Sequence, residues 1–350
     1  MPAGQKPYLY REIFAQPQVL TALLQEEQDH IAAIARSLRA GRIRYIVIAA
    51  RGSSDNAALY GKYLFAATVG LPVALATPSL YTLYQRPPRL EDALVIGISQ
   101  SGQSTDIIAV VEEAARQGVP TVAITNDARS PLAQVAGHTI SLHAGEERSI
   151  AATKTYTAQL MALILLACHM AEDEERLAVL PQVPAAIGRC LDMDDSIAQV
   201  AERYRYMTTC VVIGRGYNYA TAYEFALKLK ELTYVMAEPY SSADFQHGPI
   251  AVITDGFPVF VFAPRGIVQE EIRRLSRRLR DRKAELVVFS DADDMLRLAR
   301  VPVPIPAPLP EWLTPFTAIV LGQLFVYHLT LDKGYDPDHP RRLTKVTRTR

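Results

Sequence analysis

Residues 45–56, Tyr-Ile-Val-Ile-Ala-Ala-Arg-Gly-Ser-Ser-Asp-Asn, decide the fold of this chain. A short β-branched apolar run breaks at Arg-Gly-Ser-Ser and leads into a helical pattern, which predicts a strand, a loop and a helix. Three further strands are predicted in the same half of the chain, at 93–98, 121–124 and 139–142. Continuous apolar strands that alternate with helices indicate a parallel α/β sheet covered on both faces.

The same pattern returns in the second half. Residues 210–216 repeat the apolar strand and its Arg-Gly break, and strands are predicted at 258–263 and 286–290 with spacings that match the first half. The sequence therefore predicts two similar α/β units in tandem. We expect the chain to divide into a helical lead-in at 1–40, a first domain at 41–180, a second domain at 190–333 and a C-terminal tail at 334–350.

Two stretches connect these parts. The acidic, proline-containing stretch 172–184 marks the expected junction of the domains. Alternating prolines from Pro302 to Pro310 predict a stiff, extended connector before the final helix.

Composition narrows the class of protein. A length of 350 residues suits about two domains, and 49% apolar residues can form sizeable cores. Basic and acidic residues balance at 37 each, so no basic field indicates nucleic acid or a membrane surface as a partner.

Cysteine use and hydropathy point to a reducing compartment. Cys168, Cys190 and Cys210 lack metal-ligand spacing and lie in apolar or helical surroundings, so we expect buried thiols. The first residues contain no apolar run typical of a signal peptide. The apolar stretch 160–171 is too short to span a bilayer and is expected to form a buried helix. Together these features predict a cytoplasmic protein.

The most chemically suggestive segment lies at 221–249. Good helix formers fill 221–234, and Glu224, Lys228 and Glu231 follow one another along one side of the expected helix. The ordinary interpretation is a solvated charged face. A turn-prone link after Pro239 then leads to His247, where an imidazole on a loop suits proton transfer near neutral pH.

Two loops of the first domain are candidates for holding an anion. One contains Gly52, Ser53 and Ser54, and the other is Ser-Gln-Ser-Gly-Gln-Ser-Thr at 99–105. Both follow strands, and ligands of open parallel sheets bind beyond the carboxyl ends of strands. Neither a P-loop nor a dinucleotide motif is present, so a phosphate monoester fits better. The alternative is that 99–105 only caps a helix.

A third loop and the tail complete the candidate features. The loop at 145–156 leads into a helix and is expected to close over the same ligand, whereas the second domain has Ala-Pro-Arg-Gly at 263–266 and lacks the hydroxyl pattern. The tail at 336–350 is either a frayed basic terminus or a support for Lys345. A partly desolvated lysine near other cations is a candidate imine-forming amine.

These motifs in this order resemble the sugar isomerase (SIS) family. The resemblance runs from Glu12 to Lys345 and is to the isomerase half of glucosamine-6-phosphate synthase and its free-standing relatives, among which the SIS-type glucosamine-6-phosphate deaminase looks closest. Its motifs are Ser-Gln-Ser-Gly at 99–102, Ala-Thr-Lys at 152–154, Ala-Leu-Lys-Leu-Lys-Glu at 226–231, His-Gly-Pro at 247–249, and Asp338, Pro340, Arg341 and Leu343 ahead of Lys345.

The resemblance implies two tandem SIS domains, each a flavodoxin-like parallel sheet between helices. It implies that Glu231 shuttles a proton between C1 and C2, that Lys228 lies beside the sugar oxygens, and that Lys345 forms an imine with the ketose. His247 would assist ring opening from a neighbouring subunit of a homodimer. The implied substrate contacts are Ser53, Ser54, Ser99, Gln100, Ser101 and Ser104 for the phosphate, and Ile150, Ala151 and Ala152 for the sugar.

The implied reaction converts glucosamine 6-phosphate to fructose 6-phosphate and ammonia, without a metal or cofactor. No cysteine precedes Cys168, so a glutaminase domain with an N-terminal cysteine is not expected. Alternatives within the class are a galactosamine-6-phosphate deaminase, a fructosamine-6-phosphate deglycase and an amino-sugar synthase with a separate ammonia donor. The alternative of another class is a non-catalytic phosphosugar-binding regulator.

Overall fold

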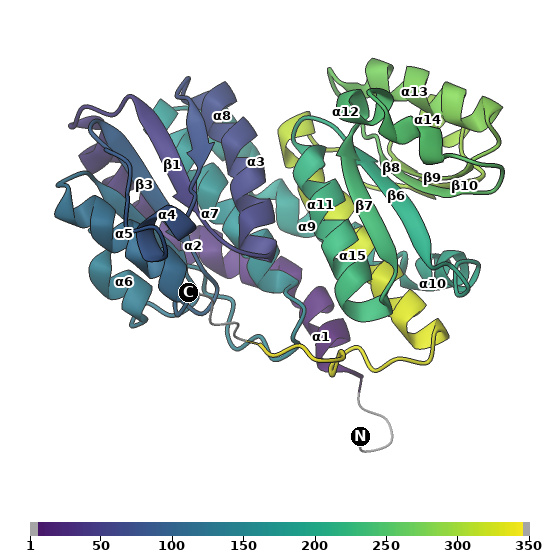
Figure 1. The fold of residues 1–350 in the computed structure, drawn as a ribbon, viewed down its shortest axis with the longest axis horizontal. Coiled ribbons are helices and arrows are strands. Elements are labelled where there is room, and N and C mark those ends of the chain that lie inside the picture. Colours follow the sequence, from purple (N-terminus) through teal and green to yellow (C-terminus); the bar gives the residue numbers. More distant parts are fainter. Residues whose placement is uncertain (1–5, 346–350) are drawn as a thin grey trace. The chain divides into compact units, whose positions relative to one another are not determined.

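The structure of the protein is a computed structural model that describes residues 6–345. These residues form two units, each described by itself below (Figure 1). The N-terminal unit consists of Gln18–Glu147, Lys154–Gln182, Thr344 and Lys345; the C-terminal unit consists of 6–17, Arg148–Thr153 and Val183–Leu343. Met1–Gln5 and Val346–Arg350, the last five residues of the expected tail, lie outside the described residues.

The N-terminal unit contains a five-stranded parallel sheet. Its order is β2 (Val73–Leu75), β1 (Tyr45–Ala49), β3 (Ala93–Ile98), β4 (Thr121–Thr125) and β5 (His138–Ser141). The four strands expected from the sequence are confirmed, whereas three-residue β2 was too short to carry a detectable apolar pattern. Because β1 pairs with both β2 and β3, the strand order reverses beside it, as in flavodoxin-like sheets.

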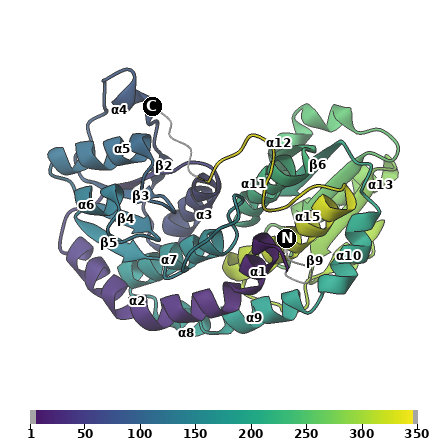
Figure 2. The same ribbon diagram turned by 90° about the horizontal axis from the view of Figure 1, so that it is seen from below.

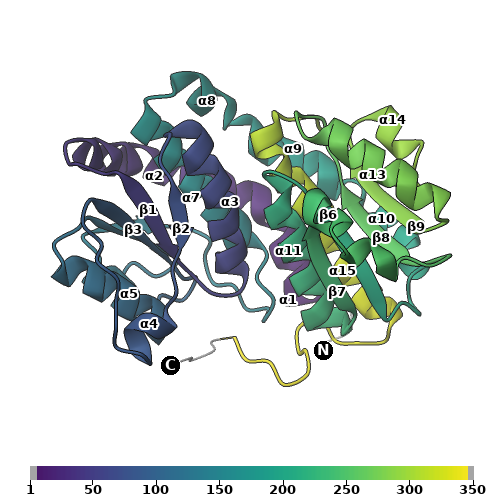
Figure 3. The ribbon, with the colours of Figure 1, turned by 45° about the horizontal axis from the view of Figure 1, so that its top comes forward.

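Helices cover both faces of this sheet. On one face α3 meets β1 and α7, since Gly61 lies close to Ile48 and Leu163. On the other face α5 and α6 pack on β3, since Gly97 is in contact distance of Val111 and Leu132. Figure 3 shows α3 beside β1 and β2. The helices are α2 (Gln16–Arg39), α3 (Ser53–Thr68), α4 (Ser79–Thr82), α5 (Thr105–Arg116), α6 (Pro131–Val135), α7 (Lys154–Ala171) and α8 (Glu174–Val179).

The C-terminal unit repeats the architecture. Its parallel sheet has the order β7 (Met236–Ser241), β6 (Thr209–Gly214), β8 (Pro258–Phe262), β9 (Glu285–Ser290) and β10 (Val301–Pro304). Taken in chain order within each unit, the five strands occupy the same positions in both sheets. The predicted tandem repeat of parallel α/β units is confirmed.

Two predictions in this unit are wrong in detail. The turn-prone link expected after Pro239 continues as the short helix α12 (Ser242–Gln246). Pro239 itself lies in strand β7, and the connector expected from Pro302 begins as strand β10. Both are edge strands, and proline is tolerated at sheet edges because its missing N–H breaks no ladder there. Proline was therefore a poor marker of irregular structure in this chain.

The two faces of the second sheet have different cores. One buries aliphatic side chains such as Val259 and Val261 beneath α13. The other buries phenylalanine rings, with Phe225 of α11 and Phe325 of α15 packed on Phe260. The helical segments are α1 (Tyr8–Phe14), α9 (Gln182–Leu191), α10 (Asp194–Glu202), α11 (Asn218–Lys228), η1 (Leu229–Thr233), α12 (Ser242–Gln246), η2 (Pro249–Val252), α13 (Gln269–Asp281), α14 (Asp293–Leu296), η3 (Glu311–Leu313) and α15 (Thr314–Asp332).

Two very apolar helices lie in the cores. Helix α7 contains the run predicted to be a buried helix, and sixteen of its residues are buried. Within residues 6–345, one helix, at 311–332, is long and apolar enough to cross a membrane by length and composition. Because 94% of that apolar window is buried inside the protein, it is a core helix of this fold.

Candidate active site

The row of Glu224, Lys228 and Glu231 in the C-terminal unit is buried at its first two positions. The side chains of Glu224 and Lys228 are 0% and 2% exposed, while Glu231 keeps 25% of its side chain exposed. The ammonium Nζ of Lys228 lies 2.5 Å from Oε2 of Glu231 and 3.5 Å from Oε1 of Glu224. The ordinary interpretation, a solvated face, is therefore wrong, because α11 packs against the sheet and against α15 and has little free surface.

A wide helical turn sets this arrangement. Helix α11 continues into the π-helical turn η1, in which the hydroxyl of Thr233 donates to the carbonyl of Leu229 over 2.7 Å. Single π-turns are rare and often occur at functional sites. The segment ends at Tyr234, whose φ of 57° is left-handed, so the helix stops five residues before Pro239. Phe225, Leu229 and Leu232, spaced i, i+4 and i+7 along this segment, form its buried apolar face.

His247 lies at the end of a short helix rather than on an open loop. Ser241 caps α12 by accepting from the N–H groups of Ala243 and Asp244. The backbone N–H of His247 closes the helix by donating to the Asp244 carbonyl over 3.0 Å. The side chain of His247 is exposed, and among residues 6–345 its ring has no hydrogen-bond or ion-pair partner. The imidazole can therefore meet a ligand or another subunit.

The two predicted anion loops lie at the carboxyl end of the N-terminal sheet, after inner strands. They follow β1 and β3, which are adjacent and parallel, so both loops leave the carboxyl ends at the point where strand order reverses. Nε of Arg51 donates to Oδ2 of Asp106 over 2.7 Å and so joins the first loop to the start of α5. Ser54 is buried, and its hydroxyl accepts from Gln159 over 3.0 Å.

The second loop, 99–104, is more than a helix cap. Ser104 occupies the N-cap position of α5, yet among the described residues its hydroxyl bonds to no N–H of the first turn. It lies instead 3.3 Å from the hydroxyl of Ser99, across the loop. Ser101 accepts from the N–H of Gln103, and Gln100 is half-buried. The hydroxyls of Ser99 and Ser104 therefore face each other around a turn, which suits binding of a phosphoryl group.

Gly102 makes this turn possible. Its φ is +61°, and a Cβ at this position would overlap the side chain of Ser130. The Gly102 carbonyl accepts from the N–H of Leu132, while Thr125 donates to the carbonyl of Gln100. The loop is thus fixed by the segments that follow β4.

Asp106 and Asn126 are organising residues that were not predicted from the sequence. Asp106 is buried and holds Arg51, and Asn126 bonds both to the Gly145 carbonyl (2.7 Å) and to the Ala144 N–H (3.0 Å). Asp106 was detectable as an acidic residue in the first turn after a hydroxyl-rich loop. Asn126 carried no comparable signal, because its partners are distant in sequence.

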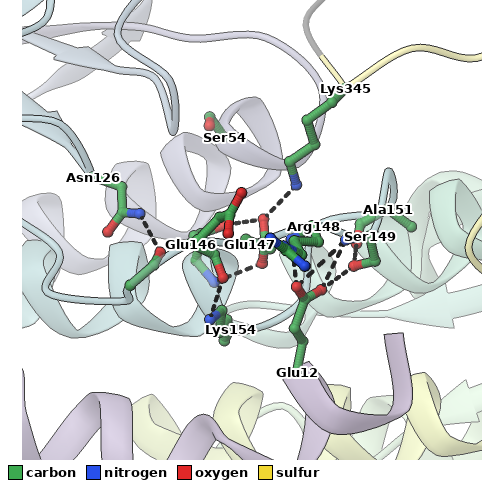
Figure 4. Close-up of polar contacts among 12 residues, drawn as sticks. Glu12, Ser54, Asn126, Glu146, Glu147, Arg148, Ser149, Ala151, Lys154 and Lys345 are labelled. Carbon is green, nitrogen blue, oxygen red and sulfur yellow. Dashed lines mark hydrogen bonds and ion pairs between the residues drawn. The ribbon is translucent and has the colours of Figure 1, made fainter. Parts of the chain in front are cut away.

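Lys345 lies against a carboxylate. Its Nζ is 2.8 Å from Oε2 of Glu147 (Figure 4). The Glu147 side chain is fully buried and also accepts from the N–H and the hydroxyl of Thr155. Lys345 is partly desolvated, as expected, since 26% of its side chain is exposed, and the charged group at its Nζ is the Glu147 carboxylate. The alternative of a frayed terminus does not hold for 337–340, since Pro337, Asp338 and Pro340 are buried, whereas residues 341–344 are exposed.

The predicted sugar-lining residues lie in the segment 148–153 of the C-terminal unit. Ala151 is buried, and Ile150 and Ala152 are half-buried. The hydroxyl oxygen of Ser149 lies 3.0 Å from the Ala151 carbonyl oxygen within the same turn.

In the C-terminal unit, the loop that corresponds to 99–104 follows β8, and its backbone N–H groups are bound by side chains of the same chain. After β8, the N–H of Arg265 donates to Oδ1 of Asp291 (2.7 Å), and the N–H of Ile267 donates to Oε2 of Glu311 (2.9 Å). Backbone donors that could hold an anion are thus used by internal carboxylates. This agrees with the missing hydroxyl pattern at 263–266.

Comparisons with known proteins place the chain in a family. The model of the SIS domain matches residues 42–168 and 207–332. Glutamine–fructose-6-phosphate aminotransferase (isomerizing) of Pyrococcus horikoshii is 34% identical over 348 residues, which cover 98% of this chain and 58% of that protein. The chain therefore spans a little over half the length of this relative.

Solved structures of phosphosugar enzymes are also similar to this chain. A crystal structure from Silicibacter pomeroyi DSS-3, described as a candidate phosphosugar isomerase, is 35% identical with a TM-score of 0.87, covering 95% of this chain and all of that one. The C-terminal domain of glucosamine-fructose-6-phosphate aminotransferase from Francisella tularensis has a TM-score of 0.88 at 25% identity, covering 97% of this chain and all of that one. With one domain match in each of its two α/β halves, the chain belongs to the SIS domain family.

Proposed function

We propose that this protein is a phosphosugar aldose-ketose isomerase that deaminates glucosamine 6-phosphate to fructose 6-phosphate and ammonia. The observation that carries the proposal is the Lys228–Glu231 pair, in which a partly exposed carboxylate is held 2.5 Å from a buried ammonium. A carboxylate fixed in this way suits proton transfer between adjacent carbons of an open-chain sugar. The names of the relatives, aminotransferase (isomerizing) and phosphosugar isomerase, support the substrate class.

The remaining site residues take the other roles. Two loops of the N-terminal unit hold the phosphate, through Ser53, Ser54, Ser99, Gln100, Ser101 and Ser104. The sugar is lined by Ile150, Ala151 and Ala152. Loops at the carboxyl ends of parallel strands with facing hydroxyls support the first assignment. His247 opens the sugar ring, and its exposure supports delivery to the site of a second subunit in a homodimer.

The chemistry balances with water as the only co-substrate. Glu231 removes the C2 proton of the open-chain amino sugar and returns it to C1, while one proton passes from the amine nitrogen to O1, which gives an imine at C2. The amine of Lys345 adds to C2 and expels ammonia, and water then hydrolyses the lysine imine to release fructose 6-phosphate. The ammonium of Lys228 stabilises negative charge on the sugar oxygens.

The test is ammonia release from glucosamine 6-phosphate by the purified protein, with fructose 6-phosphate measured in the same reaction. Galactosamine 6-phosphate and fructosamine 6-phosphates serve as comparison substrates. Glu231→Gln is the control that removes the proton-transfer group and keeps its shape. Turnover confined to a comparison substrate changes the assigned sugar. Binding of every sugar phosphate without turnover would indicate a regulator and refute the proposal.

A further inference from the structure

We infer that helix α1 positions the sugar-lining segment and the C-terminal tail for the reaction, with Glu12 and Asp338 as its two positioning residues. The inference rests on the proposed function, because that function gives the two segments their roles. It concerns contacts within the C-terminal unit. Neither Glu12 nor Asp338 touches a proposed reacting atom, so both would act through the segments that they hold.

Glu12 holds the sugar-lining segment. Its side chain is buried, and its Oε1 accepts from the N–H of Arg148 over 2.5 Å. Oε2 accepts from the N–H of Ser149 over 3.2 Å and also from the Ser149 hydroxyl. Figure 4 shows the Glu12 carboxylate pointing at this backbone. These donors on one carboxylate fix the backbone immediately before Ile150, since hydrogen bonds to a charged group are the strong ones.

Asp338 holds the tail. It is buried, and its carboxylate accepts from the N–H groups of Tyr8 (2.8 Å) and Leu9 (2.9 Å) at the start of α1. Pro7, at the N-cap position, has no side-chain acceptor, so the cap comes from a residue more than three hundred positions away. A carboxylate at a helix N-terminus is favourable both as a cap and against the helix dipole.

Helix α1 is itself fixed to the core of its unit. Leu9 and Ile13 are fully or almost fully buried, and the Tyr10 hydroxyl donates to Asp194 over 2.9 Å. Gln16, two residues past the helix, donates to Gln323 of α15 over 2.8 Å. Figure 2 shows α1 against α15. The helix is therefore a rigid support for both carboxylate contacts.

The tail has a second attachment, at Tyr234, just after the π-helical turn η1 that carries Glu231. The N–H of Arg341 donates to the hydroxyl of Tyr234 over 2.8 Å, and its guanidinium lies 4.6 Å from the Tyr234 ring centroid and 5.0 Å from that of Tyr335. Tyr234 follows Glu231 closely in the chain. Lys345 lies only four residues beyond Arg341, so chain length keeps their Cα atoms within about 14 Å of each other. Fixing Asp338 and Arg341 thus limits where the Lys345 amine can go.

Two variants separate positioning from general stability. Glu12→Gln places an amide among N–H and O–H donors, and Asp338→Asn weakens the cap of α1. The matched controls are Glu172→Gln and Asp255→Asn, whose carboxylates are 71% and 74% exposed in surface ion pairs. Ser149→Ala is a milder substitute if Glu12→Gln does not fold, because it removes only the hydroxyl contact.

The first measurement is hydrogen exchange of the whole protein. We expect faster exchange in peptides covering 146–153 for Glu12→Gln, and in peptides covering 8–14 and 336–343 for Asp338→Asn. The two control variants should exchange as the wild type does. Wild-type exchange in both test variants would overturn the inference, and this readout requires no turnover.

The second measurement is a split of the kinetic constants. Glu12→Gln should raise KM for glucosamine 6-phosphate about tenfold, because misplaced contacts cost affinity, while inhibition by inorganic phosphate stays unchanged. Asp338→Asn should lower kcat, and borohydride trapping of fructose 6-phosphate on Lys345, about tenfold each. If KM and kcat changed equally in both variants, or did not change, α1 would have only a structural role. Absence of turnover in the wild type would count against the proposed function. Hydrogen exchange alone would then show whether Glu12 and Asp338 hold their segments.

Discussion

The ammonium of Lys345 lies 2.8 Å from Oε2 of Glu147, a carboxylate with no exposed surface. This pair gives the lysine a structural role as well as its proposed chemical one. Breaking a pair by removing one partner leaves a buried charge behind, which is costly. The two roles can be separated by choosing what replaces the lysine.

Lys345→Arg should keep the ion pair and lose the imine chemistry, because a guanidinium stays protonated. We expect a melting temperature near that of the wild type and no borohydride-trapped adduct with fructose 6-phosphate. Lys345→Met should also lose the adduct and, in addition, destabilise the protein by about 1–3 kcal/mol, since Glu147 loses a partner. Equal stability of the two variants would show that the pair contributes nothing.

Glu231→Gln should lower kcat by about 10²–10⁴-fold, as expected for loss of a general base, with little change in stability. The variant keeps the side-chain volume, and Glu231 is the most exposed of the three charged residues in its row. Steady-state kinetics and thermal unfolding check this. A fully active variant would require another proton-transfer group.

Lys228→Met should destabilise the protein by about 3–5 kcal/mol, because it leaves Glu224 buried without its cation. Adding Glu224→Gln to this variant should recover part of the loss, since the amide carries no charge. Denaturant unfolding of the single and double variants gives the coupling energy. Additive effects would mean that the two side chains do not interact.

Gly102→Ala should weaken binding of sugar phosphates and of inorganic phosphate, because the new Cβ would overlap Ser130 and distort the loop 99–104. Gly70→Ala is the matched control. Gly70 also has a positive φ, 76°, but a Cβ there would meet nothing within 4 Å. Isothermal titration with phosphate measures both variants. Equal losses would point to backbone strain and not to the loop.

The three thiols should be unreactive in the folded protein. Burial raises the pKa of Cys168 and of Cys190 to about 12, and it also raises the pKa of Cys210. Because only the thiolate reacts, a chromogenic disulfide reagent should titrate none of them quickly near pH 8 and all three after unfolding. A fast-reacting thiol in the native protein would contradict this burial.

Local sequence pattern was enough to predict most of the fold. Strands such as Ala93–Ile98 are continuous apolar runs with loops at both ends, so the parallel sheets and the repeat were predictable. Strands β7 and β10 were missed because their prolines indicate irregular structure, and edge pairing that tolerates proline is not visible in a sequence.

The candidate site was predictable only where its residues are close in sequence. The spacing of Lys228 and Glu231, and the hydroxyls of 99–104, could be recognised directly. The burial of Lys228 could not, because it depends on how α11 packs. The partners of Glu147, Glu12 and Asp338 were equally invisible, because each contact is formed by tertiary packing.

The edge prolines have one more consequence. Pro239 lies in one outer strand of the C-terminal sheet, and Pro302 and Pro304 lie in the other. An outer strand normally presents a row of unpaired amide groups on which a foreign strand can assemble, and this is a route to aggregation. With donors missing at both rims, this half of the protein is a poor template for such intermolecular growth, which should favour solubility at high concentration.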